Sequence, residues 1–159
     1  AIEKIQARTT PVQSWFLDQS LVLGYWSGEG KRSYHHTAPV NSLYALHESL
    51  LILKNEGLEN AWQRHRDMHE KLKQGLEKLS FEFVVEQDSR LPQLNAIYVP
   101  QGIDEAKVRT HLLETYNLEI GAGLGALAGK AWRIGLMGYG ARAENVALCL
   151  RALEEALTQ

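Results

Sequence analysis

The chain has 159 residues, of which 45% are hydrophobic and 23% charged, a composition typical of an ordinary globular protein. Its 17 basic residues nearly balance 19 acidic ones, which leaves a formal net charge of −2. Because no long block carries a single sign of charge, the sequence gives no electrostatic basis for binding nucleic acid or an anionic membrane, and neither partner is expected.

The apolar stretches and the cysteine content argue for a cytoplasmic protein. The longest apolar runs, Leu50–Leu53 and Val146–Leu150, fall far short of the roughly 20 residues that span a bilayer. The only cysteine, Cys149, has no partner for an internal disulfide, and the N-terminus does not resemble a secretory signal.

The first 35 or so residues show no sustained periodicity of hydrophobic residues. Ala1–Arg8 reads as a helix already in progress, and Ala1 is not an initiator methionine, so we expect further residues to precede it. A short apolar group, Leu21–Trp26, ends in Ser27–Lys31, which has the composition of a loop.

Two amphipathic helices follow. The first is predicted to have Thr37 as its N-cap and Pro39 in its first turn, with Gly57 ending it. The second is predicted over Leu58–Leu79. Their apolar faces are Leu43, Leu46, Leu50 and Leu53 in the first helix, and Ala61, His65, Met68, Leu72, Leu76 and Leu79 in the second.

After the first of these helices, the spacing of hydrophobic residues alternates between that of helices and that of strands. The predicted order, which begins with the helix at Leu58, is α-β-β-α-β-β-α. This order indicates an α+β domain with helices over one face of a mostly antiparallel sheet. Gly57 is the one clear organisational break. The predicted strands are Phe81–Val85, Asn95–Val99, Leu118–Ile120 and Ala131–Leu136, and the predicted helices are Asp104 to about Tyr116 and a last one after Gly140.

The glycine-rich run Gly121–Ala126 formally matches the dinucleotide-binding pattern G-x-G-x-x-A. A strand-like segment follows it in place of the required helix, and position 141 is alanine where an acid is needed, so we reject a dinucleotide site. Gly129-Lys130 does not complete a phosphate-binding loop either. The run is then either a turn between strands or a flexible loop beside a ligand.

The histidines and the cysteine do not predict a metal site or a nucleophile. Adjacent His35 and His36 would point to opposite sides of an extended segment, and His65 with His69 lacks the glutamate and third ligand of a zinc site. A structural or surface role is expected for all four. Cys149 lies on the apolar face of the last helix and reads as core packing.

Tyr34 and Thr37 stand just before a predicted helix N-terminus, where backbone N–H groups favour an anion. Their hydroxyls would suit a phosphate, or else Thr37 would only cap the helix while Tyr34 packs. Arg133 lies within an apolar, strand-like run. Its guanidinium would bind either a substrate carboxylate or an internal acidic partner. The spacing alone leaves both questions open.

Four segments together resemble one family, the alanine–glyoxylate and serine–pyruvate aminotransferases of the class V, fold-type I group of pyridoxal-phosphate (PLP) enzymes. The resemblance runs in order along essentially the whole chain, and Tyr-His-His-Thr with Lys-x-x-Arg-Ile-Gly is fairly specific. The segments are Thr10–Asp18, Tyr34–Tyr44, Gly121–Gly125 and Gly129–Gly138.

The resemblance implies a homodimer in which Tyr34 and Thr37 reach the PLP phosphate of the neighbouring subunit. It implies that Arg133 binds the α-carboxylate of small amino-acid and 2-oxo-acid substrates, and that Gly121–Gly129 lies near the active-site mouth. Residues 1–57 would be the end of the large PLP-binding domain with a connecting helix, and residues 58–159 the small C-terminal α+β domain.

The resemblance also implies that the catalytic residues lie outside this chain. In the family a lysine in a Ser-x-x-Lys context forms the Schiff base and moves the proton, and an aspartate pairs with the pyridinium nitrogen; without them the chain alone would be inactive. None of its eight lysines stands in that context: Lys4, Lys31, Lys54, Lys71, Lys73, Lys78, Lys107 and Lys130.

Three functions therefore remain open. The first is the C-terminal part of an enzyme that transfers an amino group from alanine or serine to glyoxylate or pyruvate. The second is a non-catalytic, stand-alone α+β binding module derived from such an enzyme. The third, a different fold-type I reaction such as decarboxylation or desulfuration, is weaker because no cysteine is placed for desulfuration. The terminus Ala156–Gln159 carries no peroxisomal address.

Overall fold

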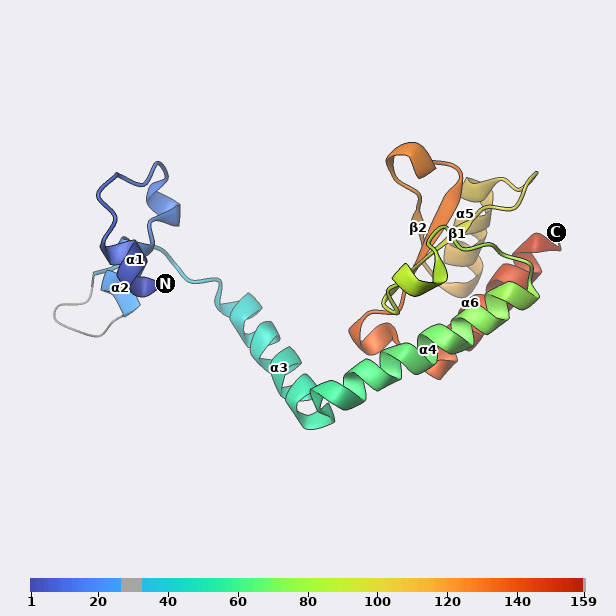
Figure 1. Ribbon diagram of the computed structural model, residues 1–159, viewed down its shortest axis with the longest axis horizontal. Coiled ribbons are helices and arrows are strands. Elements are labelled where there is room, and N and C mark those ends of the chain that lie inside the picture. Colours follow the sequence, from blue (N-terminus) through green and yellow to red (C-terminus); the bar gives the residue numbers. More distant parts are fainter. Residues whose placement is uncertain (27–32, 159) are drawn as a thin grey trace. The chain divides into compact units, whose positions relative to one another are not determined.

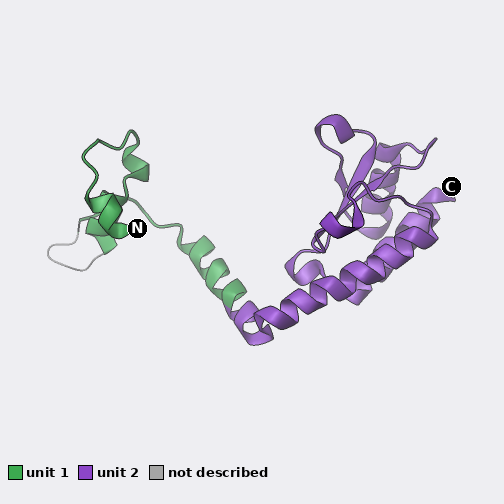
Figure 2. Ribbon diagram, viewed as in Figure 1, with its two compact units in different colours: residues 1–50 green, residues 51–159 purple. Residues whose placement is uncertain are grey.

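The computed structural model describes residues 1–26 and 33–158, so the predicted loop at 27–31 lies outside the described residues. The chain forms two compact units, residues 1–50 (unit 1) and residues 51–159 (unit 2) (Figure 2). Its elements in chain order (Figure 1) are α1 (Ile2–Gln6), α2 (Gln19–Trp26), α3 (Val40–Glu56), α4 (Leu58–Lys78), β1 (Leu94–Tyr98), α5 (Glu105–Tyr116), β2 (Gly121–Ala122), β3 (Ala131–Gly135) and α6 (Ala143–Leu157), with short 3-10 turns between them.

Unit 1 has two short helices and little buried surface. The predicted helix at the N-terminus is confirmed as α1, and the apolar group at Leu21–Trp26 lies within α2. No residue of α1, α2 or α3 is buried. The irregular segments around Trp15 and His35 contact each other through a hydrogen bond and a pair of tilted rings.

Gly57 separates α3 from α4 as the sequence predicted. Its φ of +85° is a left-handed conformation that glycine adopts without strain. The other end of α3 differs from the prediction, because the helix begins at Val40 and the N–H of Leu43 bonds to the carbonyl of Pro39. Thr37 as N-cap is therefore wrong: a capping side chain must stand directly before the helix, and Thr37 stands two residues too early.

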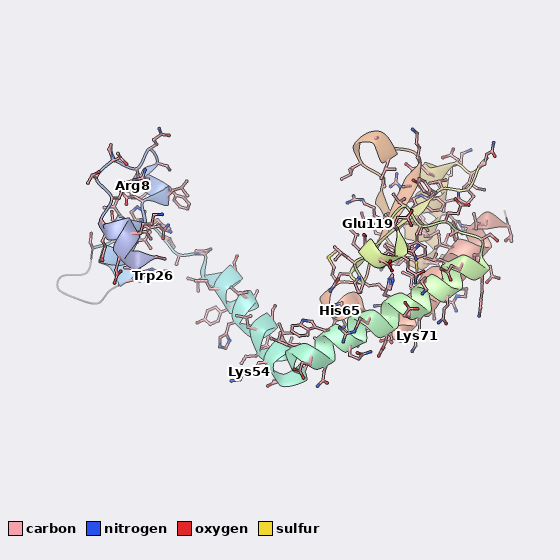
Figure 3. All side chains as sticks on the ribbon, viewed as in Figure 1. Arg8, Trp26, Lys54, His65, Lys71 and Glu119 are labelled. Carbon is pink, nitrogen blue, oxygen red and sulfur yellow. The ribbon has the colours of Figure 1, made fainter. Side chains whose placement is uncertain are left out.

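The predicted buried face of α4 is confirmed, with Ala61, His65, Met68, Leu72 and Leu76 all buried. Both histidines of α4 have structural partners. His65 Nδ1 lies 2.6 Å from the Ala61 carbonyl oxygen and its Nε2 accepts from the Gly138 N–H (Figure 3, where His65 is labelled). His69 Nδ1 lies 2.7 Å from Asn95 Oδ1 in the interior. Within the described residues no group of three potential ligands could hold a metal ion.

The sheet of unit 2 has three antiparallel strands in the order β1-β3-β2. Its register places Ile97 opposite Trp132 and Asn95 opposite Ile134, and all four side chains are buried. Successive side chains of a strand point to opposite faces. Arg133, between Trp132 and Ile134, therefore stands on the face of the sheet away from the core.

Two of the four predicted strands are wrong in detail. Phe81–Val85 makes only a single bridge, Phe83 to Ile97, before the chain turns away into a 3-10 helix at Gln87–Ser89. Leu118–Ile120 is not a strand either. Its first N–H closes the end of α5, because Asn117 adopts a left-handed conformation and Leu118 donates to the Leu112 carbonyl. The strand begins only at Gly121.

The core of unit 2 lies between the sheet and the helices, and the α+β class is confirmed. It joins Leu72 of α4, Leu112 of α5, Leu153 of α6 and Trp132 of β3. Helices α4 and α6 lie side by side (Figure 1). Gly75 permits their close approach, since a Cβ there would stand 2.2 Å from Leu150 Cδ1. Among the described helices none is long and apolar enough to cross a membrane.

The N-terminus of α5 provides a test of the local structure of unit 2. The Asp104 carboxylate accepts hydrogen bonds from the N–H groups of Ala106 and Lys107 at 3.1 Å each. We expect Asp104→Ala to lower the free energy of unfolding by about 1 kcal/mol, because two N–H groups lose their acceptor. Asp104→Asn keeps an acceptor and serves as the control. Urea denaturation of both variants measures the effect, and an equal loss in the two would contradict a capping role.

Candidate functional site

The hydroxyls of Tyr34 and Thr37 lie together in unit 1. Tyr34 Oη and Thr37 Oγ1 are 2.6 Å apart, and both side chains are exposed. One hydroxyl donates to the other, so at least one O–H remains free to donate to an added group. Three residues after Thr37 the chain enters α3, whose first N–H groups have no partners within the helix. A pair of hydroxyl donors beside a helix N-terminus has the chemistry to bind a phosphate.

The residues between these two hydroxyls are anchored to the segment around Trp15. The ring of His35 is buried and lies 4.0 Å from the Trp15 ring, and the ring of His36 lies 4.8 Å from that of Phe16. Asp18 is the carboxylate near His35. A hydrogen bond from the Ser20 hydroxyl lowers the pKa of Asp18, which is therefore ionised at neutral pH.

Arg133 of unit 2 is fixed at one end of its guanidinium and free at the other. Its Nε donates to the Ala122 carbonyl oxygen at 2.8 Å, across the β2–β3 pair. Among the described residues no carboxylate lies within ion-pair distance of it. The arginine is half-buried, and its Nη1 and Nη2 make no hydrogen bond or ion pair with any residue that the structure describes. A carboxylate is the ligand that this fork of donors suits best.

The glycine-rich segment joins β2 to β3 and contains a 3-10 turn at Gly125–Leu127. Gly123 must be a glycine for lack of space, because a Cβ there would stand 2.0 Å from the Leu127 carbonyl oxygen. Gly129 has a φ of +72°. The segment is therefore a folded turn between strands, and it begins at the two residues, Gly121 and Ala122, that contact Arg133.

The structure thus brings Tyr34 and Thr37 together and places Arg133 in unit 2, on the open face of the sheet. Two features that support these residues were not evident in the sequence. One is the anchoring of His35 by the Trp15 carbonyl, and the other is the Ala122 carbonyl that orients Arg133. The pair of adjacent histidines between Tyr34 and Thr37 was the only sequence signal of the anchoring to Trp15. No sequence signal indicated the bond between Arg133 and the Ala122 carbonyl.

Comparisons with known proteins identify the family of the chain. The family model "Aminotransferase class-V" matches residues 17–146, which is well over half of the chain. The chain therefore belongs to the class V aminotransferases, and the enzymes of this family use pyridoxal phosphate.

Among its relatives, the alanine–glyoxylate aminotransferase of Callithrix jacchus is 43% identical over 99% of this chain and 38% of its own length. The crystal structure of an alanine–glyoxylate aminotransferase from Nostoc sp. superposes with a TM-score of 0.89 at 47% identity, covering 98% of this chain and 41% of that one. A ureidoglycine–glyoxylate aminotransferase structure from Bacillus subtilis gives a TM-score of 0.90 at 37% identity, covering 99% and 40%. The chain spans about two fifths of the length of these relatives.

Cys149 is not available as a nucleophile, and its reactivity can be measured. Burial raises the pKa of its thiol to about 12, so the thiolate is scarce at neutral pH. We expect a thiol-specific reagent at pH 8 to leave Cys149 unmodified in the folded protein and to modify it fully in 8 M urea, where the pKa returns to about 8.5. Equal rates in the two conditions would show that the thiol is exposed.

Proposed function

We propose that this chain is the C-terminal part of a PLP-dependent aminotransferase that uses glyoxylate as its amino acceptor. The observation that carries the proposal is the guanidinium fork of Arg133, which the Ala122 carbonyl holds on the face of the sheet away from the core and which has no acidic partner in the part of the chain that the structure describes. The sequence had left a substrate carboxylate and an internal partner equally open, and the absence of an internal partner among the described residues favours the substrate.

In this proposal Arg133 binds the α-carboxylate of the amino acid and of the oxo acid in turn. The two terminal nitrogens can donate in parallel to the two carboxylate oxygens, which fixes the orientation of the substrate as well as its affinity. The same carboxylate is present in both half-reactions, so one arginine serves donor and acceptor alike.

Tyr34 and Thr37 would bind the PLP phosphate, and they would do so across a homodimer. Their paired hydroxyls fit a phosphate because they can donate two hydrogen bonds to it once their mutual bond is exchanged. When bound, the cofactor supplies the electron sink that transamination requires. The lysine and the aspartate that complete the site would lie in residues that precede this chain in the full-length enzyme.

The exposed apolar surface of α3 supports a longer polypeptide. Leu43, Leu46 and Leu50 share one face of this 17-residue helix and are each about half exposed, Val40 and Ile52 add exposed apolar area beside it, and no residue of the helix is buried. A contiguous apolar surface of this kind needs a partner. We propose that residues preceding this chain in the same polypeptide cover it, so that residues 1–57 complete the large domain and residues 58–159 form the small one.

The relatives differ in amino donor, since their names specify alanine in two cases and ureidoglycine in the third, but all three names specify glyoxylate. Glyoxylate is the acceptor on which our proposal therefore depends. The donor, whether alanine, serine or another small amino acid, would be selected partly by residues outside this chain. We expect a cytoplasmic enzyme.

The native polypeptide tests this proposal directly. We expect an intact mass of more than twice the 17.9 kDa of this chain. We also expect the native protein to convert alanine and glyoxylate to pyruvate and glycine, and borohydride to attach the cofactor to a lysine outside this chain. A native species near 17.9 kDa that binds small carboxylates without transamination would instead favour the non-catalytic binding module.

Substitution of Arg133 in the full-length enzyme tests the substrate site. We expect Arg133→Ala to lower kcat/KM for both substrates roughly 10- to 150-fold, since a hydrogen bond to a charged group contributes about 1.5–3 kcal/mol. The Kd of PLP should stay within a factor of about two, because the cofactor does not use this carboxylate site. Arg90→Ala, an arginine of the same unit, is the control. Equal losses for substrate and cofactor would rule out the assignment.

A further inference from the structure

The side chain of His35 is fixed by a hydrogen bond that determines its tautomer. It is 6% exposed, and its Nε2 lies 2.9 Å from the carbonyl oxygen of Trp15. A carbonyl oxygen only accepts, so Nε2 carries the hydrogen. In the neutral ring the other nitrogen, Nδ1, is then an acceptor.

His36 supplies the donor for that acceptor. Its Nδ1 lies 2.7 Å from His35 Nδ1, so in the neutral pair His36 carries its hydrogen on Nδ1. The ring of His36 also packs on Phe16. A continuous path therefore runs from the Trp15 carbonyl through both imidazoles, and it fixes the rotamers of two adjacent side chains.

This path lies between the two residues that we assign to the cofactor phosphate. Tyr34 precedes the pair and Thr37 follows it, and residues 33–39 form neither helix nor strand. The backbone here has no ladder of main-chain hydrogen bonds to hold it. The side-chain contacts of His35 and His36 with Trp15 and Phe16 provide the constraint instead.

We propose that His35 and His36 are positioning residues that hold the hydroxyls of Tyr34 and Thr37 at the spacing needed to bind a phosphate. This inference rests on the proposed function of Tyr34 and Thr37. The histidines act through those hydroxyls and do not touch the phosphate. The essential element is the single N–H that His36 donates to His35, because without it the buried His35 Nδ1 loses its partner and the two imidazoles no longer fix each other's rotamers.

The test compares two substitutions of His36 in the full-length protein. His36→Phe keeps a ring against Phe16 but removes the donor, whereas His36→Asn places an amide nitrogen near the position of Nδ1 and keeps it. The Kd of the apoprotein is measured for PLP and for pyridoxal, which lacks the phosphate. We expect His36→Phe to weaken PLP binding about 10-fold, the size of one hydrogen bond, and to leave pyridoxal binding unchanged.

His36→Asn should retain most of the wild-type preference for PLP over pyridoxal. His111→Phe is the matched control, since His111 also bonds a neighbouring side chain, Thr115 Oγ1, but lies in unit 2. Its preference should equal that of the wild type. A loss of PLP and pyridoxal affinity to the same extent in His36→Phe would mean that the histidine only supports the fold, and would overturn the inference.

A further variant separates this inference from the function on which it rests. The double substitution Tyr34→Phe with Thr37→Val removes both hydroxyls. If it keeps the preference for PLP, then these residues do not bind the phosphate and both proposals fall. If it abolishes the preference while His36→Phe retains it, the phosphate site stands and the positioning role of the histidines is wrong.

Discussion

The antiparallel pairing of β1 with β3 is the constraint on which the rest of unit 2 depends. It aligns Ile97 with Trp132 and Asn95 with Ile134, so the large side chains meet on one face and build the core with α4, α5 and α6. Because successive side chains of a strand point to opposite faces, Arg133 must lie on the face opposite to Trp132 and Ile134. Burial of its two neighbours places the arginine on the open side, where the Ala122 carbonyl of β2 orients it. Core and candidate site are thus two consequences of one register.

Unit 1 is organised differently, because it has little main-chain pairing to position its candidate site. The segment with Tyr34 and Thr37 is anchored through aromatic and imidazole contacts to the Trp15 turn. Such a site depends on side-chain identity at several positions at once. The arginine of unit 2 and the hydroxyl pair of unit 1 should therefore respond differently to mutation, because a strand holds the arginine and a small cluster of rings holds the hydroxyls.

The two parts of the chain differ in how much of their apolar surface is buried: unit 2 has a compact core, whereas α3 has an exposed apolar face. Residues 58–158 bury a hydrophobic core of their own, whereas α3 has an apolar surface that nothing in the described chain buries. The similarity to aminotransferases more than twice as long fits this asymmetry. The proposed role of Arg133 is consistent with membership of the class V family.

The sequence by itself determined the α+β class, the helices α3 to α6 with Gly57 between the first two, the buried face of α4 and the core position of Cys149. It could do so because the periodicity of a helix and a glycine that ends it are local features of the sequence. Through the resemblance, it also indicated Tyr34, Thr37 and Arg133 as binding residues. It did not determine that Phe81–Val85 would make only one bridge, or that Leu118 would be used by the end of α5, because both depend on which backbone groups find partners. Only the tertiary structure decided that Thr37 bonds Tyr34 and does not cap α3, that His35 is tied to Trp15, and that Arg133 bonds the Ala122 carbonyl and no carboxylate of the described residues. Each of these depends on distances in space that the local sequence pattern does not encode.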